Sequence, residues 1–362
     1  MLQQRLTFRR GATSVMAVLP SRNLVMGIAI GYPLHIYQIF LGTLRATSYA
    51  GDITLVVGPN TSAAILIFCA EQQAKVRDAA SLGLSLQASS QSRNHLQIMR
   101  YQTYMQLCLA SQHNFCLATD FRDVFFQRDP FSSFHESMGA QNRPVLVLSL
   151  EHSNMTTTDE GVNSYWLRVC KGANHSIIGK PIICSGTIYG TPAGFAALGH
   201  AFASTRCNGY REGIDQAVLN WLVHAPAHSE PGRHAESPHS SMVRMGDVAV
   251  SVTLQVRGTG AVNSLWGYSR TNATSAEMID QGIGSLDGIV RNVNGKPSPV
   301  VHQFDRMVQL LWYTRRFRFD ALSKYDKLPC MWHEWQEGNK KLKTTCYFVN
   351  GTDGDVRLIH LS

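Results

Sequence analysis

The chain has 362 residues, of which 44% are hydrophobic and 16% are charged, and its formal net charge is +8. This composition indicates a globular chain with ample material for a core and excludes the disordered class, which is highly charged and poor in apolar residues. No segment reaches the roughly 18 apolar residues of a membrane-spanning helix, and no run of Lys and Arg alternates with aromatic residues, so we expect no nucleic-acid partner. The positive balance fits a phosphorylated or acidic ligand, and equally an ordinary basic surface.

The first part of the chain predicts a βαβ unit. Residues 23–32 form an apolar run typical of a buried parallel strand, helical spacing follows over 35–47, and a second buried strand is expected at 53–57. We therefore expect parallel strands with a right-handed crossover. The next predicted elements are a helix within 62–82, a short third strand near 84–86 and a helix over 94–111.

Residues 115–131 (FCLATDFRDVFFQRDPF) are the most informative stretch. An apolar run ends abruptly at Asp120 and Asp123, a pattern typical of a buried strand whose tip leaves the sheet. Ligands of open α/β sheets bind at the carboxyl ends of strands, and two carboxylates with Arg122 between them suit a divalent cation that carries a phosphorylated ligand. The alternative is local: Asp120 caps the next turn and Asp123 pairs with Arg122.

The second half of the chain predicts further strands and helices. Ser185-Gly186 interrupts one of the strands, and glycine within a strand often marks a close approach by a ligand or by backbone. Residues 224–241 hold four unevenly spaced histidines among Pro, Ser and Gly, which indicates a mobile loop rather than a metal site. The predicted elements are strands at 144–150, 182–189 and 245–256, a strand tip that enters a turn at 299–307, and helices at 163–171, 193–204 and 214–224.

The cysteines and the N-glycosylation sequons indicate the cellular compartment in which the chain is expected. The eight cysteines include no C-x-x-C pair, so no zinc or redox motif is indicated. Glu337-Gly-Asn339 is a turn signal, and a three-residue loop there would place Cys330 opposite Cys346, so we predict a hairpin with a disulfide between them. Five N-x-[ST] sequons indicate a lumenal or extracellular chain if the source is eukaryotic, and disulfides form in that compartment. The sequons lie at Asn60, Asn154, Asn174, Asn272 and Asn350.

Four blocks occur in order: GIAIGYP with GDITLVVGP, then ATDFRDVFFQRDP, then CSGTIYGT with EGIDQAVLN, then VVHQFDR. Together they resemble nucleotide-sugar-dependent glycosyltransferases of the GT-A fold, particularly eukaryotic and algal-virus members with a D-x-R-D-V-x-F-Q-x-D-P-F stretch. The resemblance implies a Rossmann-like α/β fold, with a mixed, mostly parallel sheet flanked by helices in one large domain over 23–306. Residues 1–22 are interpreted as an N-terminal segment with two open alternatives, a truncated stem whose membrane anchor lies upstream or the start of a soluble protein. Residues 307–362 are interpreted as a C-terminal extension with the hairpin.

The resemblance also implies a metal site. In that family an Asp-x-Asp-like motif binds Mn²⁺ or Mg²⁺, which bridges the diphosphate of the donor, here a UDP- or GDP-sugar. Asp120-Phe-Arg-Asp123 matches the motif with one extra residue, so Asp123 is favoured as the direct ligand and Asp120 as a contact to the ribose or the metal. A late histidine commonly supplies a third ligand, and His302 fits, since imidazole suits Mn²⁺. Otherwise His302 is a structural histidine that is hydrogen-bonded in the core.

The remaining site residues each have a functional and a local interpretation. Arg100 and Arg122 are candidates for binding the diphosphate or orienting the carboxylates, because guanidinium binds such oxygens bidentately; the alternative is a solvated charge or a structural ion pair. In similar enzymes an acidic residue at this place lies near the acceptor hydroxyl, which makes Asp215 the candidate general base. Asp215 is also a candidate helix N-cap, and the two roles do not exclude each other. Ser185, Gly186 and Thr187 would line the sugar or acceptor site, and Gln216 is a further candidate for binding the nucleotide-sugar donor, as are Ser185 and Gly186.

The resulting prediction is a metal-dependent glycosyltransferase that moves a sugar from a nucleotide-diphosphate donor to an acceptor hydroxyl of a glycan or glycoconjugate. If the source is eukaryotic, we expect it in the Golgi or another secretory lumen. Two alternatives stay open: an inactive glycosyltransferase-like protein that binds glycans or partners, and a metal-dependent phosphohydrolase with paired aspartates. The latter class usually places an aspartate at the tip of the first strand, where this chain has Gly31-Tyr-Pro33, and this argues against it.

Overall fold

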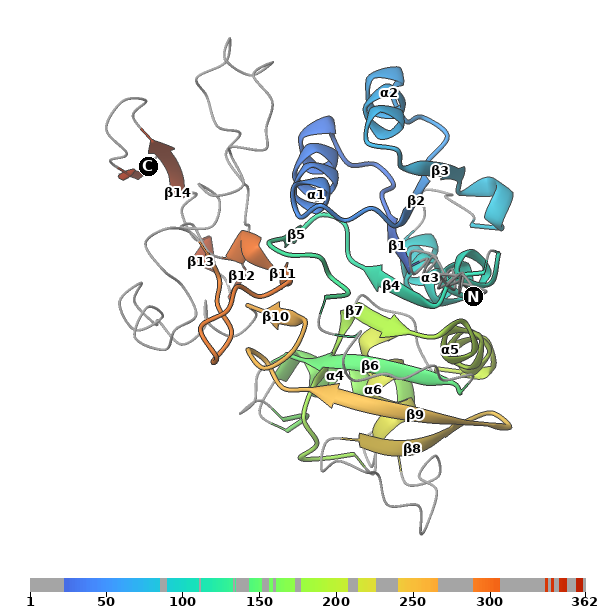
Figure 1. The fold of residues 1–362 in the computed structure, drawn as a ribbon. Helices are drawn as coiled ribbons and strands as arrows, with labels where there is room; N and C mark the ends of the chain where they lie inside the picture. Colours follow the sequence, from blue (N-terminus) through green and yellow to red (C-terminus); the bar gives the residue numbers. More distant parts are fainter. Residues whose placement is uncertain are drawn as a thin grey trace, which may run out of the picture.

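The computed structural model describes residues 23–306, with gaps at 85–89, 111, 133, 135–142, 152–155, 159–160, 173–176, 208–213, 226–239 and 266–288, and the backbone of four short strands between residues 336 and 360. Figure 1 shows helices packed around a central sheet. Most of the histidine-containing segment that we expect to be a mobile loop lies outside the described residues. The division of the chain at residues 22 and 306 stays a prediction.

Eight strands form the central sheet, in the order β3-β2-β1-β4-β7-β6-β9-β8 (Figure 1). The pairs from β3 to β4 and the pair β6–β9 are parallel, and the other three pairs are antiparallel. This confirms the predicted mixed, mostly parallel sheet flanked by helices. The strands are β1 (Asn23–Ile28), β2 (Asp52–Val57), β3 (Lys75–Asp78), β4 (Phe115–Thr119), β6 (Val145–Leu150), β7 (Ile183–Gly190), β8 (Ser240–Met245) and β9 (Val248–Gln255).

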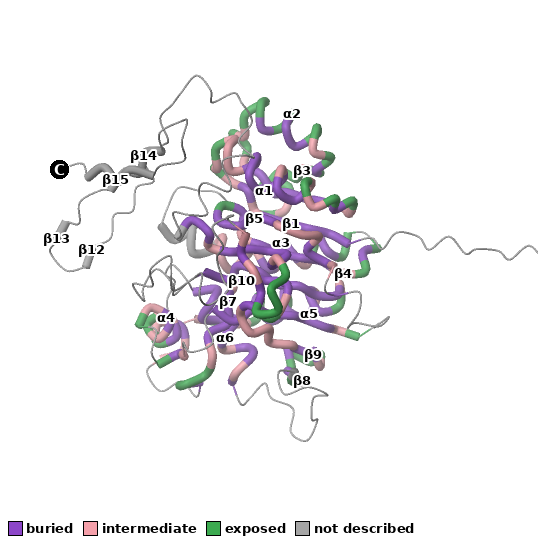
Figure 2. Tube along the Cα trace, turned by 60° about the vertical axis from the view of Figure 1, so that its left-hand side comes forward, coloured by how far each residue is buried: buried purple, intermediate pink, exposed green. Residues whose placement is uncertain are grey.

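Alternate residues of the inner strands divide between two hydrophobic clusters, as expected where successive side chains point to opposite faces of a sheet. In β4, Cys116 and Ala118 belong to one cluster and Leu117 to the other. Helices α3 to α6 contribute to the first cluster, and α1 and α2 to the second. Figure 2 shows the inner strands buried between these helices. The helices are α1 (Leu34–Ala46), α2 (Ala63–Glu71), α3 (Ser90–Leu109), α4 (Gly161–Lys171), α5 (Pro192–Ser204) and α6 (Ile214–His224), with a short 3-10 helix at Ala80–Leu82.

A second, three-stranded sheet in the order β10-β11-β5 brings distant parts of the chain together. Strand β5 (Val124–Phe126) begins just after the acidic turn and pairs antiparallel with β11 (Val300–His302), so that Val124 lies opposite His302. Strand β10 (Val262–Ser264) pairs parallel with the other edge of β11. A 3-10 helix (Phe304–Arg306) follows β11. The pairing carries the VVHQFDR block to the end of β4.

Two strands differ from the sequence-based expectation. The third strand lies at Lys75–Asp78, not near 84–86; it is a largely exposed edge strand and lacks the apolar run on which the expectation depended. Leu84 is buried without belonging to a strand. The strand expected at 245–256 is present as β9, but it begins only at Val248. Met245 ends an additional strand, β8, and pairs with Val248 around Gly246, whose φ of +63° favours glycine.

Two disulfides lie on the side of the sheet covered by α3 to α6. Cys108 near the end of α3 is bonded to Cys116 in β4, and Cys170 in α4 is bonded to Cys207 beyond α5. The first of these bonds fixes α3 against the strand that leads into the acidic turn. Among the described helices, none has both the length and the hydropathy that a membrane span requires.

The predicted C-terminal hairpin is present, but its loop has two residues rather than three, because Glu337 pairs with Lys340. Cys346 lies in a second hairpin, opposite Ile359. Cys330 is outside the described residues, so a disulfide between Cys330 and Cys346 stays a prediction. The four strands are β12 (Gln336–Glu337), β13 (Lys340–Lys341), β14 (Thr345–Val349) and β15 (Val356–His360).

Candidate active site

The side chain of Phe121 anchors the acidic turn that follows β4. Its ring is buried and packs against Tyr37 and Phe40, with ring centroids 4.7 and 4.6 Å away. The amide of Asp120 donates a hydrogen bond to the carbonyl oxygen of Gly186 at 2.6 Å, so the start of β7 holds the other side of the turn. Anchored in this way, the turn presents the carboxylates of Asp120 and Asp123 at the carboxyl end of the strand, where ligands of such sheets bind.

The pairing of β11 with β5 places His302 against this turn. Its Nε2 lies 3.3 Å from Oδ2 of Asp120 and 3.8 Å from Oδ1 of Asp123. Each of the three residues offers one potential ligand atom, and these three atoms all lie within 4.8 Å of one another. The three side chains that we predicted to bind a metal therefore converge, and we call them the Asp-Asp-His cluster.

The imidazole of His302 is enclosed, with only 1% of its side chain exposed. Nδ1 lies 3.3 Å from Sγ of Cys184, whereas Nε2 makes no well-formed hydrogen bond although it faces Asp120. Burial lowers the pKa of His302, but the Cys184 thiol and the carboxylates of Asp120 and Asp123 outweigh it and hold the pKa well above its ordinary value. A divalent cation would bring positive charge to the same two carboxylates, in competition with the proton on His302.

The donor set of the cluster fits a divalent cation. Two carboxylates and an imidazole suit Mn²⁺. Mg²⁺ binds the same carboxylates but has a weaker preference for a nitrogen ligand. A buried Nε2 without a well-formed hydrogen bond is the expected state of a nitrogen whose partner is a metal. Burial, followed by the proximity of Asp120 and Asp305, raises the pKa of Asp123, and a bound cation would offset this cost.

Arg100 connects the Asp-Asp-His cluster with Asp215. From α3, its Nη1 donates to Oδ1 of Asp120 at 2.7 Å, while its Nη2 donates to the carbonyl oxygen of Ser185 at 3.0 Å and contacts the Asp215 carboxylate. Only 14% of the Arg100 side chain is exposed. Because its two amino groups are held by two carboxylates and a carbonyl, the geometry favours the orienting role for Arg100 over direct binding of a diphosphate.

Arg122 has a different environment from Arg100. Its side chain is 47% exposed, and its Nη2 lies 3.5 Å from Oδ2 of Asp123 and 3.2 Å from Oδ2 of Asp305. The local pairing of Arg122 with Asp123 is therefore present, but the guanidinium keeps exposed donors beside the cluster. Of the two arginines, Arg122 is the better placed to reach an anionic ligand.

Asp215 lies inside the first turn of α6, which begins at Ile214, so Asp215 is not the N-cap residue of this helix. The side chain is only 6% exposed and is held by Arg100. Burial raises the pKa of Asp215, and Arg100 partly offsets this rise. A carboxylate with a raised pKa in a cavity wall is suited to accept a proton from an alcohol.

Gln216 holds the irregular start of β7. Its Oε1 accepts hydrogen bonds from the backbone amide and the hydroxyl of Ser185, both at 3.2 Å, and its Nε2 donates to Glu151 at 3.0 Å and Asn163 at 2.7 Å. Both ends of the Gln216 amide are therefore used within the protein. This geometry favours a supporting role for Gln216, whereas the sequence-based expectation was that it binds the nucleotide-sugar donor.

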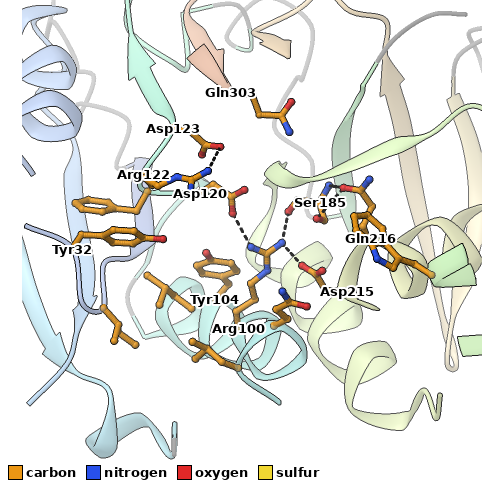
Figure 3. A pocket seen from close by; sticks show the side chains of 16 residues that line it. Tyr32, Arg100, Tyr104, Asp120, Arg122, Asp123, Ser185, Asp215, Gln216 and Gln303 are labelled. Carbon is orange, nitrogen blue, oxygen red and sulfur yellow. Dashed lines mark hydrogen bonds and ion pairs between the residues drawn. The ribbon is translucent and has the colours of Figure 1, made fainter. Parts of the chain in front are cut away.

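A cavity of about 420 Å³ lies beside these groups (Figure 3). Its size is in the range of small-molecule and cofactor sites, roughly 300 to 1,000 Å³. One part of its wall is apolar and the other carries the ionic groups; His302 and Gly186 lie behind that wall. The lining residues are Ile28, Ile30, Tyr32, Leu96, Gln97, Arg100, Tyr104, Asp120, Phe121, Arg122, Asp123, Trp166, Ser185, Asp215, Gln216 and Gln303.

Sequence reasoning missed several of these residues. Tyr32, Tyr104 and Trp166 have no pattern that separates them from core aromatics. Cys184 could have been found only through the Cys-Ser-Gly block, and Gln303 only through its place next to His302 in the VVHQFDR block.

Because Gly186 has no side chain, the Asp120 carboxylate and the His302 ring can both lie against its backbone. A Cβ at this position would overlap Oδ2 of Asp120 and the ring of His302. We therefore expect Gly186→Ala to separate the carboxylate from the imidazole and to abolish the rise in melting temperature caused by Mn²⁺, at a cost of about 1–3 kcal/mol in unfolding free energy. Gly161→Ala is the matched control, since no atom lies within 4 Å of its added methyl group and it should respond to Mn²⁺ like the wild type. Unchanged Mn²⁺ affinity of Gly186→Ala would contradict the arrangement.

Two comparisons with known proteins gave no match: no family model matches the sequence, and neither does any curated protein. Among solved structures, a galactosyltransferase, LgtC, in complex with donor and acceptor sugar analogues has a TM-score of 0.42 and 12% sequence identity, over 84% of this chain and 97% of that one. The bifunctional glycosyltransferase WbbM has a TM-score of 0.44 and 12% identity, over 79% of this chain and 46% of that one. Both scores and both identities are low, so neither similarity identifies the reaction of this chain.

Proposed function

We propose that this protein is a metal-dependent glycosyltransferase that moves a sugar from a nucleotide-diphosphate donor to an acceptor hydroxyl. The observation that carries the proposal is the convergence of Asp120, Asp123 and His302 beside a cavity of suitable size. The sequence blocks that resemble nucleotide-sugar-dependent enzymes contribute all three residues. A cluster of this composition supports the metal, and its place at the carboxyl end of β4 supports a phosphorylated ligand.

In the proposed enzyme the Asp-Asp-His cluster would hold Mn²⁺ or Mg²⁺. Such a cation supplies Lewis-acid stabilisation of the charge that develops on a leaving diphosphate. Arg122, half exposed beside the cluster, binds the diphosphate oxygens and adds positive charge where that charge develops. Arg100 orients Asp120 and Asp215 from behind the cavity wall, so the two arginines have separate roles.

Asp215 is the proposed general base. The hydroxyl of the acceptor must lose a proton as its oxygen bonds to the sugar, and a carboxylate within hydrogen-bonding reach takes that proton. Burial raises the pKa of Asp215 and Arg100 offsets part of this rise, which favours the ionised form that can accept the proton. Ser185 also lines the cavity, and its carbonyl oxygen accepts a hydrogen bond from Arg100; the sugar or the acceptor contacts this segment of β7.

A secretory-pathway lumen is the proposed location if the source is eukaryotic. The two disulfides support it, since such bonds persist in oxidising compartments. Asn60, in the first of the five sequons, is exposed in the loop after β2 and is accessible for glycosylation.

The test measures binding and turnover separately. The melting temperature is recorded with UDP or GDP, each with and without Mn²⁺, and nucleotide release is followed with a panel of sugar nucleotides and glycan acceptors. The proposal expects stabilisation by one nucleoside diphosphate that requires Mn²⁺, and release that increases with an acceptor. Hydrolysis of phosphate esters without donor preference would favour a phosphohydrolase, and glycan binding without turnover would favour an inactive relative; either outcome would overturn it.

A further inference from the structure

One phenol in the cavity wall makes no hydrogen bond within the described protein. Tyr104, from α3, lines the cavity, and only 4% of the residue is exposed. Its ring packs edge-on against Tyr101, with the ring centroids 6.3 Å apart, and belongs to the first hydrophobic cluster. In the part of the chain that the structure describes, no group forms a hydrogen bond with the Tyr104 hydroxyl. Buried hydroxyls nearly always have a partner, so this one calls for a ligand.

The charges around Tyr104 indicate where its hydroxyl points. Burial raises the pKa of the Tyr104 phenol, and the positive charge of Arg100 opposes this rise. The carboxylates of Asp120 and Asp215 raise the pKa further. Because such effects weaken with distance, the hydroxyl end of the ring points toward the ionic part of the wall. Figure 3 shows the ring between Tyr32 and Arg100. The phenol stays protonated at neutral pH, so it is a hydrogen-bond donor.

The position of Tyr104 relative to the proposed chemistry favours contact with the sugar. In a glycosyl transfer, the bond that breaks joins the sugar to the diphosphate, which the Asp-Asp-His cluster would hold through the metal. The acceptor oxygen that Asp215 deprotonates attacks the same carbon of the sugar. The sugar must therefore lie between the cluster and Asp215. Since Asp120 of the cluster and Asp215 both act on Tyr104, its hydroxyl borders this position.

The charge of the wall around Tyr104 indicates which kind of sugar fits. Two carboxylates, those of Asp120 and Asp215, face the single guanidinium of Arg100. The amino groups of Arg100 are already held by these carboxylates and by the carbonyl oxygen of Ser185. An anionic group at this place would meet two like charges beside a neutralised cation. A sugar hydroxyl suits the wall better, because it accepts from the phenol and donates to a carboxylate.

We propose that the hydroxyl of Tyr104 donates a hydrogen bond to a hydroxyl oxygen of the transferred sugar, and that this sugar is neutral. The inference rests on the proposed function. It deepens that function in two ways: it names a residue that recognises the sugar, and it assigns the donor to the class with neutral rather than acidic sugars.

Tyr104→Phe tests the contact, because it removes the hydroxyl and keeps the ring. Tyr189→Phe is the matched control: the buried Tyr189 hydroxyl donates to the carbonyl oxygen of Pro130 at 3.0 Å, and Tyr189 is outside the cavity lining. Titration calorimetry with Mn²⁺ measures the affinities for UDP, GDP, UDP-glucose, UDP-galactose, UDP-N-acetylglucosamine and GDP-mannose. An acidic sugar nucleotide with the preferred base is added, either UDP-glucuronic acid or GDP-mannuronic acid. Melting temperatures without ligand report stability.

The two variants should show opposite effects. Tyr104→Phe should bind the nucleoside diphosphate like the wild type, and the neutral sugar nucleotide about 2- to 10-fold more weakly. Its melting temperature should not fall, because the lost hydroxyl has no hydrogen bond in the described part of the protein. Tyr189→Phe should melt at a lower temperature and keep all affinities. The wild type should bind the acidic sugar nucleotide about tenfold more weakly than the preferred neutral one, or weaker still.

Three results would overturn the inference and leave the proposed function standing. They are wild-type affinity of Tyr104→Phe for every sugar nucleotide, an equal loss of affinity for the nucleoside diphosphate, and a preference of the wild type for the acidic sugar nucleotide. Failure of the wild-type protein to bind any nucleoside diphosphate with Mn²⁺ would overturn the proposed function, and this inference with it.

Discussion

Replacing Asp123 by Asn is expected to remove Mn²⁺ binding and to lower the rate of sugar transfer by on the order of a thousandfold or more. Asp123 is buried and lies 3.8 Å from His302 through Oδ1. An amide of the same shape keeps the packing but gives up the negative charge that a divalent cation requires. Transfer activity and the Mn²⁺-dependent rise in melting temperature are the two measurements.

The free energy of unfolding of Asp123→Asn, measured without metal, should not fall, although metal binding and transfer activity are lost. Burial raises the pKa of Asp123, and the neighbouring carboxylates of Asp120 and Asp305 raise it further, so its ionised form is unfavourable in the folded protein. Asp123→Asn should therefore be at least as resistant to urea as the wild type when no metal is added. Asp247→Asn, in the exposed turn between β8 and β9, is the control and should change neither quantity. Wild-type Mn²⁺ stabilisation in Asp123→Asn would remove this residue from the metal site.

Replacing Arg100 by Met is expected to destabilise the fold strongly, by about 3–5 kcal/mol at pH 8. The guanidinium is enclosed and neutralises the buried carboxylate of Asp215, as well as that of Asp120, which is more exposed and contributes less. Methionine fills much of the volume but leaves Asp215 as an unpaired buried charge. Urea unfolding of Arg100→Met and of the wild type measures the loss.

The loss should depend on pH in a defined direction. Burial raises the folded-state pKa of Asp215 above its ordinary value, and Arg100 limits the rise. Without Arg100 the folded-state pKa moves further up, so stability is retained below the ordinary carboxyl pKa and is lost as the pH rises through the higher folded value. The difference between Arg100→Met and the wild type should thus be small near pH 4 and full at pH 8.

A double variant tests the cause. Arg100→Met with Asp215→Asn removes the buried charge together with its partner, and it should recover most of the stability at pH 8. Transfer activity should not recover, because the proposed general base is absent. If the double variant is no more stable than Arg100→Met, the ion pair with Asp215 is not what makes Arg100 important.

The structure separates residues that the sequence treats as equivalent. Arg100 and Arg122 had the same two interpretations, and only their exposure, 14% against 47%, assigns them different roles. Gln216 differs from expectation, because both ends of its amide are used by internal hydrogen bonds. These differences depend on partners from distant elements, which no local pattern reveals.

The sequence by itself determined the elements whose signal is local. Continuous apolar runs specified the buried strands, and the run that stops at Asp120 placed two carboxylates at a strand end. Patterns failed where a strand has no apolar run: β3 is a charged edge strand, and β8, which ends just before Gly246, is rich in polar residues.

Only the tertiary structure decided that His302 lies against Asp123 and that Arg100 joins Asp120 to Asp215. The first contact depends on the register of two three-residue strands, with Val124 opposite His302, and strands this short carry no register of their own. The second depends on α3 and α6 packing on the same face of the sheet. Such contacts follow from the burial of the whole core, because the free energy that fixes them is shared among residues far apart in the chain.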